Sequence, residues 1–187
     1  MTAIPPTRYT STAIVLHWLA AALILGNFAF GLYMTDLPVS PDKLRYYSWH
    51  KWAGMTILLL SALRLLWRLW HPSPDLPSAM PPWQRRLAGA SHHLLYVLFF
   101  AIPLTGWLFS SASGFPVVYF GIVPLPDLIA KNKELADLMQ TTHSSLNYLL
   151  ATLVVIHGAA ALKHHLADGD DVLVRMLPFL KPRNLNS

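Results

Sequence analysis

The stretch THSSLNYLLATLVVIHGAAALKHHL, residues 142–166, carries no formal charge before Lys163 and is long enough to cross a lipid bilayer as a helix. It contains two histidines, His143 and His157, which are fourteen residues apart. At about 100° and about 1.5 Å per residue, fourteen steps bring a helix back to within about 40° of its starting direction and raise it by about 21 Å. One helical face therefore carries an imidazole toward each side of the membrane. Because a membrane-buried imidazole is costly unless it binds something, this face predicts a functional site.

The composition favours a membrane protein over other classes. Of the 187 residues, 54% are apolar and only 12% are charged, which is about half the charged fraction of a typical globular domain. The formal charge of +5 could indicate a nucleic-acid partner, but the apolar content and the placement of the charges favour a membrane and no nucleic acid. There is no cysteine, which excludes disulfides and thiolate-ligated metal sites.

Three further stretches predict membrane-spanning helices, which gives an all-α, integral membrane four-helix bundle in one domain over residues 1–187. The expected spans are approximately 13–34, 48–70, 87–111 and 141–166, and none of them contains Asp or Glu. Residues 35–47 are expected to form a polar loop, and residues 71–86, with five prolines, an extended connector. Residues 112–140 are expected to form a longer loop, in which 131–140 are one short amphipathic helix.

The distribution of Lys and Arg predicts the orientation of the bundle. Four spans place both termini on one side, and that side receives nine basic residues, whereas the other receives five. The nine are Arg8, Arg64, Arg68, Arg85, Arg86, Lys163, Arg175, Lys181 and Arg183, and the five are Lys43, Arg45, Lys51, Lys131 and Lys133. An excess of basic residues marks the cytoplasmic face, so both termini are expected to be cytoplasmic in a bacterial inner membrane.

Depth within the spans sorts four histidines into two pairs. His50 and His143 are expected near the outer face, and His17 and His157 near the inner face. Two imidazoles at one depth on different helices suit a non-covalent b-type haem, which binds between helices through axial ligands on opposite sides. The sequence thus predicts two bis-histidine haems. A histidine-based metal carrier without redox activity is the less favoured alternative, because zinc sites usually add carboxylate, thiolate or water ligands.

Other polar residues near the inner pair have two interpretations each. Arg64 and Arg68 are candidates for pairing with haem propionates, or they extend to the inner interface with no ligand. His92 and His164 are candidate contacts for a quinone headgroup, while His92 and His93 are also possible competing haem ligands and His165 fits an interfacial position.

Several motifs make the chain similar to one known family. These are RYTSTAIVLHW at residues 8–18, HKWAG at 50–54, the Arg64 to Arg68 end of the second span, and HGAAALKHH at 157–165. His92 with Tyr96, Pro103 with Gly106, and VLVRMLP at 172–178 also match. Together they resemble the bacterial b561-type cytochrome b family, four-helix dihaem proteins related to the cytochrome b subunits of nickel hydrogenases.

The resemblance implies two b-type haems with axial ligands at His17, His50, His143 and His157, in agreement with the pairing by depth. It also implies an activity, because short single-chain members resemble superoxide oxidases that pass electrons from periplasmic superoxide to ubiquinone in the membrane. Lys43, Arg45 and Lys51 would then form a cationic entrance for superoxide near His50, or else be ordinary interfacial cations. The alternative role is an electron-transfer anchor for a partner dehydrogenase or hydrogenase.

Overall fold

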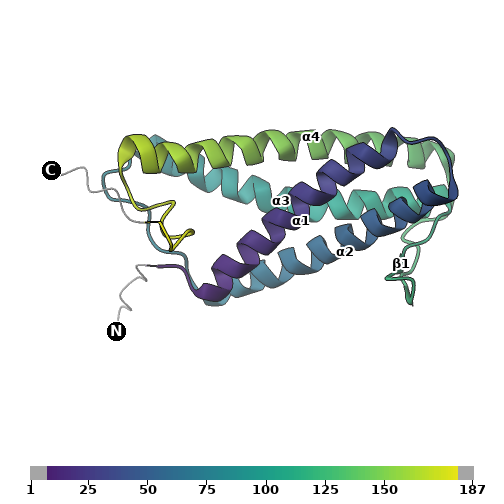
Figure 1. The fold of residues 1–187 in the computed structure, drawn as a ribbon, viewed down its shortest axis with the longest axis horizontal. Helices are drawn as coiled ribbons and strands as arrows, with labels where there is room; N and C mark the ends of the chain where they lie inside the picture. The colour runs from purple at the N-terminus through teal and green to yellow at the C-terminus, as the bar shows by residue number, and fades with distance from the viewer. Residues whose placement is uncertain (1–7, 181–187) are drawn as a thin grey trace.

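Four long helices form one bundle in the computed structural model, which describes residues 8–180 (Figure 1). They are α1 (Ser11–Thr35), α2 (Pro41–Trp70), α3 (Pro82–Ser113) and α4 (Lys133–Lys163). A π-helical turn, η1 (His164–Asp168), continues directly from α4, and two short strands, β1 (Val118–Tyr119) and β2 (Val123–Pro124), pair between α3 and α4. The predicted all-α bundle is confirmed, while Lys181 and Arg183, two of the residues used for the orientation, lie outside the described residues.

Each of the four helices is long and apolar enough to cross a membrane. Within the described part of the chain, both ends of the polypeptide lie at the same end of the bundle (Figure 1). The connection between α1 and α2 and the β1–β2 hairpin lie at the opposite end (Figure 1). We call these the termini end and the hairpin end of the bundle.

The expected loops at 35–47, 71–86 and 112–140 are partly wrong, because helices extend into all three. α2 begins at Pro41, since Ser40 caps it with a hydrogen bond from Lys43 N at 3.1 Å and a proline suits the first helical position. α3 begins at Pro82, so residues 82–86 are helical. Residues 133–140 are not a separate short helix but the first turns of α4, where Asn132 accepts a hydrogen bond from Leu135 N at 3.0 Å.

The buried core lies at mid-height between the two ends of the bundle. α1 packs beside α2 and α3 packs beside α4. The core comprises Ala20, Ile24, Ile57, Leu95, Leu98, Ile102 and Leu150. Leu150 lies seven residues from both His143 and His157, so this apolar layer separates the two predicted histidine pairs along α4.

Candidate functional site

His50 from α2 and His143 from α4 face each other in the hairpin-end half of the bundle. Their ring centres are 6.2 Å apart and their planes are 83° apart. If the two imidazoles bind one metal ion from opposite sides, a metal–nitrogen bond of about 2.0 Å and about 1.1 Å from that nitrogen to the ring centre give a spacing of about 6.2 Å between the ring centres. The observed spacing therefore suits a single metal ion held between the two rings.

The backbone of α3 orients the His143 ring. Its Nδ1 lies 3.0 Å from the carbonyl oxygen of Ile102, an arrangement that fixes a histidine tautomer and leaves Nε2 for a metal. Gly106 makes this approach possible, because a Cβ there would lie 3.0 Å from Cε1 and 3.2 Å from Nδ1 of His143. In the sequence Gly106 was only part of a family motif, and its contact with the histidine was not predicted.

Gly31 plays the same part for His50. A Cβ at Gly31 would lie 3.1 Å from Cε1 of His50. Helix α1 can therefore approach the ring this closely only because residue 31 is a glycine. Asn27, one turn earlier, donates a hydrogen bond to the His50 carbonyl at 3.4 Å. His50 Nδ1 is buried without a hydrogen-bond partner among the described residues. Neither Gly31 nor Asn27 was predicted, since a glycine or asparagine in an apolar span carries no signal of what it faces.

A cavity of about 610 Å³ adjoins this pair. Its lining is mostly apolar and includes both histidines, Gly54 and Gly106. Ligand pockets are commonly of this size and character. A flat apolar macrocycle with two axial imidazoles needs such a space between helices, so the residues present fit a b-type haem.

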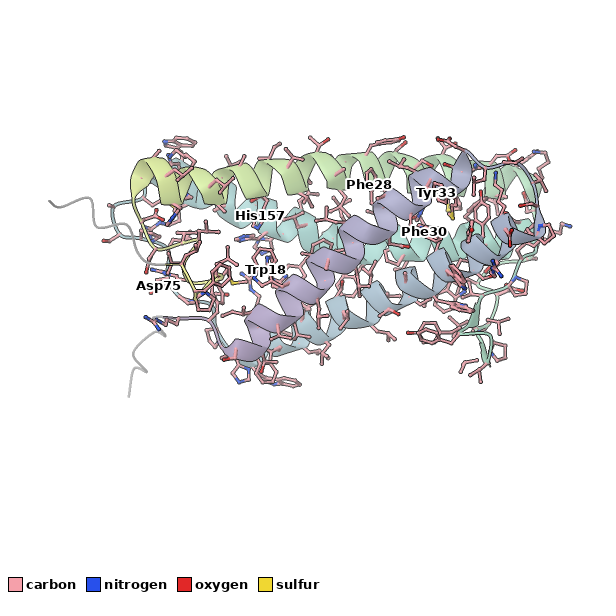
Figure 2. All side chains as sticks on the ribbon, in the orientation of Figure 1. Trp18, Phe28, Phe30, Tyr33, Asp75 and His157 are labelled. Atoms are coloured by element: carbon pink, nitrogen blue, oxygen red, sulfur yellow. The ribbon has the colours of Figure 1, made fainter. Side chains whose placement is uncertain are left out.

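His17 from α1 and His157 from α4 form the corresponding pair in the termini-end half. Their ring centres are 6.4 Å apart with the planes at 58°. Figure 2 shows His157 pointing from α4 toward the interior of the bundle, in the same half as Trp18 of α1. The structure also brings His92 of α3 to this place, with its ring centre 5.4 Å from that of His157. Three imidazoles are therefore grouped around this pair, whereas two face each other in the hairpin-end half.

Two arginines of α2 lie beside this second pair. The guanidinium groups of Arg64 and Arg68 stack on the Tyr96 ring, at 5.2 and 5.6 Å from its centre. Neither arginine forms a salt bridge with any residue in the range 8–180. Arg64 instead donates to Nδ1 of His17 at 3.3 Å. A neutral His17 that binds metal through Nε2 carries its proton on Nδ1, so this contact and coordination through Nε2 exclude each other.

His164 lies beyond the last α-helical turn and pairs with acidic residues. Its Nδ1 is 2.6 Å from Asp170 Oδ2 and 3.2 Å from Asp168 Oδ2. Lys163 also pairs with Asp168, at 2.7 Å. The sequence placed His164 near the inner pair, but its carboxylate partners were not predicted. Asp168 lies four residues after it in the π-helical turn, and Asp170 follows that turn.

The three predicted entrance cations all lie toward the hairpin end, but each already has a partner. Lys43 donates to the carbonyl oxygens of Thr35, at 3.0 Å, and of Leu37, at the end of α1. Arg45 pairs with Asp42 at 2.9 Å. The Lys51 ammonium donates to Ser110 Oγ and the Phe115 carbonyl, both at 3.1 Å, so it also joins α2 to the chain after α3.

Comparison with known proteins identifies the family. The family model described as prokaryotic cytochrome b561 matches residues 8–179. Cytochrome b561 homolog 2 of Escherichia coli (strain K12) is 37% identical over 179 residues, 92% of each chain, and homolog 1 of the same organism is 28% identical over 91% of this chain and 97% of its own. The probable superoxide oxidase CybB of Yersinia pestis is 29% identical over 91% of this chain and 96% of its own. The chain therefore belongs to the prokaryotic cytochrome b561 family and is a multi-pass inner-membrane electron-transfer protein that binds b-type haem.

Proposed function

We propose that the protein is a superoxide:ubiquinone oxidoreductase. Two superoxide anions each give up one electron and leave as dioxygen, and one quinone takes up the two electrons together with two protons to become a quinol. The observation that carries this proposal is the presence of two imidazole pairs in opposite halves of the bundle, with one histidine of each pair on α4. The similarity to a relative named as a probable superoxide oxidase supports the choice of substrate.

The four axial ligands in this proposal are His50 with His143 and His17 with His157. Each bound haem b supplies reversible one-electron storage at its level of the membrane. The spacings of 6.2 and 6.4 Å both match two imidazoles on opposite sides of one iron. His92 lies 5.4 Å from His157, which is too short for that arrangement, so we assign His92 to another role.

Arg64 and Arg68 would hold the propionates of the inner haem. Two cations without an acidic partner in the described chain favour an anionic ligand in the same half of the bundle. Since Arg64 must leave His17 Nδ1 when that histidine binds iron through Nε2, its guanidinium becomes free to bind a carboxylate. Tyr96 keeps both side chains together by cation–π stacking.

We place the quinone headgroup at the termini end, near His92 and His164. His92 donates a hydrogen bond to a quinone carbonyl oxygen, because it lies beside the inner pair without being one of its ligands. His164 is hydrogen-bonded to Asp170, so it can donate a proton to the reduced quinone and receive another proton through the carboxylates. With the termini facing the cytoplasm, as the excess of Lys and Arg predicts, both protons come from the cytoplasmic side.

Superoxide would then approach from the periplasm at the hairpin end. Arg45 is the most exposed of the three cations, while Lys43 and Lys51 contribute positive charge from positions fixed by carbonyl oxygens. Their combined field raises the local concentration of a small anion next to the His50 and His143 pair.

The direct test uses purified protein without any partner subunit. Superoxide is expected to produce the absorbance of reduced b-type haem, and added ubiquinone is expected to abolish that signal while quinol accumulates at one per two superoxide anions. The measurement combines stopped-flow visible spectroscopy with quinol analysis, and superoxide dismutase provides the negative control. If reduction occurs only after a dehydrogenase or hydrogenase partner is added, the protein is an electron-transfer anchor instead.

The cationic entrance makes a separate prediction about salt. The second-order rate with superoxide is expected to fall several-fold between about 0.01 M and about 0.15 M ionic strength, because salt screens the attraction. Arg45→Gln should lower the rate at low salt and weaken the salt dependence. Arg85→Gln makes the same change of charge on α3 at the termini end and should leave both unchanged. Equal effects of the two variants would exclude a local entrance.

A further inference from the structure

The β1–β2 hairpin exposes large apolar side chains at the end of the bundle opposite the termini. Phe120 is 57% exposed, Ile122 is 79% exposed and Val123 is 50% exposed. Asp127 is the one charged residue between Ser113 and Ala130. Figure 1 shows the hairpin projecting sideways from the bundle beside α2, so these exposed residues lie on an element that stands outside the bundle core. An apolar tip of this kind on a projecting element needs a partner surface.

The tip is rigidly attached to α2. Trp52 Nε1 donates to the Val118 carbonyl at 2.6 Å, and the Tyr119 hydroxyl lies 2.8 Å from Thr56 Oγ1. The rings of Trp52 and Phe120 are 5.5 Å apart. Phe120 itself has a φ of 51°, a left-handed conformation that a bulky residue adopts only when its surroundings enforce it. The hairpin is therefore a fixed structure with a defined depth.

The contacts with α2 set that depth. Trp49 and Trp52 lie in the part of α2 at the hairpin end of the bundle, and Trp67 and Trp70 lie at the termini end. This is the distribution expected for tryptophans at the two membrane interfaces. From Trp49 to Trp70 the helix rises about 32 Å, close to the thickness of the hydrocarbon core. The Phe120 ring is beside Trp52, and Tyr119 reaches Thr56, about 6 Å deeper along the helix. This depth corresponds to the expected boundary between headgroups and acyl chains.

The backbone of the turn suits that environment. Gly121 N donates to the Val118 carbonyl at 3.0 Å, and Ile122 N donates to the Tyr119 carbonyl at 3.1 Å. These bonds satisfy amide groups that would otherwise be exposed to lipid. On the adjoining part of α2, Leu59 and Leu63 are 59% and 50% exposed and belong to a membrane-spanning surface. The apolar surface of the hairpin therefore adjoins the apolar surface of α2 that faces lipid.

We propose that the hairpin is a membrane-insertion element whose tip residues, Phe120 and Ile122, bury their side chains among phospholipid acyl chains of the leaflet at the hairpin end. Interfacial elements with an apolar face penetrate about 5–10 Å into this boundary, which matches the depth set by Trp52 and Thr56. The same hairpin follows Phe115, Pro116 and Val117, which line the cavity beside His50 and His143. Insertion therefore fixes the rim of that cavity relative to the bilayer surface.

The chain contains no cysteine, so a single introduced cysteine can carry a spin label. We suggest Ile122→Cys and Phe120→Cys at the tip, with Asp127→Cys as the water-exposed control on the same connection. In phospholipid vesicles, electron paramagnetic resonance would compare relaxation by oxygen, which concentrates in acyl chains, with relaxation by a water-soluble nickel chelate. A haem spectrum equal to that of the unmodified protein confirms that each variant folds.

Oxygen is expected to increase the spin relaxation rate of both tip labels, whereas the nickel chelate should have little effect on them. The chelate should increase the relaxation rate of the label at position 127. Tip labels as accessible to nickel as position 127 would show that the hairpin stands in water and would overturn the proposal. Tip labels protected from both reagents would show that protein covers the tip, such as a second copy of this chain, and would also overturn it. The second tip position decides the outcome if one substitution alters folding.

Discussion

Replacing His157 by alanine is expected to reduce the haem content of the purified protein from about two to about one haem per chain. The inner pair loses one of its two imidazoles, and the alanine side chain offers iron no ligand. His143, fourteen residues away on the same helix, keeps its bond to the Ile102 carbonyl, so the outer haem should remain. Pyridine haemochrome analysis with a protein assay measures the ratio, and the reduced-minus-oxidised spectrum identifies the haem that remains.

Ile156→Ala is the matched control, because Ile156 is the adjacent residue of α4 and is 56% exposed. That variant should keep both haems. A His157→Ala protein with normal haem content would contradict the assignment of the inner ligands. If that haem were then lost in the double variant His92→Ala/His157→Ala, His92 would be shown to serve as the ligand in place of His157.

Substitution of Gly106 is expected to remove the outer haem without touching any ligand. A Cβ at Gly106 would lie 3.0 Å from Cε1 of His143, and the ring cannot retreat from α3 without losing its Nδ1 contact with the Ile102 carbonyl of the same helix. Gly106→Ala should therefore weaken binding of the outer haem, and the larger Gly106→Val should abolish it, with about one haem per chain remaining. Titration of the purified apoprotein with haem, followed by visible absorbance, gives the affinity.

Gly89→Ala in the same helix supplies the control, since a Cβ there meets no atom within 4 Å. Alanine is normally the better helix former by about 0.5–1 kcal/mol, so Gly89→Ala should leave haem content unchanged or stabilise the protein. Loss of haem in both glycine variants would point to a general effect on α3. Normal haem affinity in Gly106→Val would show that His143 is not held as described.

The four spans could be predicted from the sequence because long apolar segments without acidic residues are typical of membrane helices and rare elsewhere. The four histidines could also be grouped by depth, since helical rise converts residue number into height. Helix ends were predicted less well. The first turns of α2 and α4 are polar and precede the apolar segments, so hydropathy gives no signal for them. The caps at Ser40 and Asn132 determine where these helices start.

The parts of the site that depend on packing between helices were not predictable. Gly31 and Gly106 face histidines of other helices, and nothing in their own neighbourhood of the sequence shows this. The partners of Lys43 and Lys51 include main-chain carbonyls from other segments, so the positions of charged residues alone could not reveal that both cations have structural contacts. The hairpin was also missed, because each of its strands has only two residues.

His143 and His157 belong to one unbroken α-helix, and this has a consequence for how the protein tolerates change. Movements of α1 or α2 can alter the angle between His17 and His157 or between His50 and His143. They cannot alter the distance between His143 and His157 along the axis of α4. Inserting one residue between positions 143 and 157 would turn one imidazole by about 100° relative to the other and direct it out of the bundle. The length of this thirteen-residue interval is therefore fixed by geometry, whereas most of its apolar side chains can be exchanged for others of similar size.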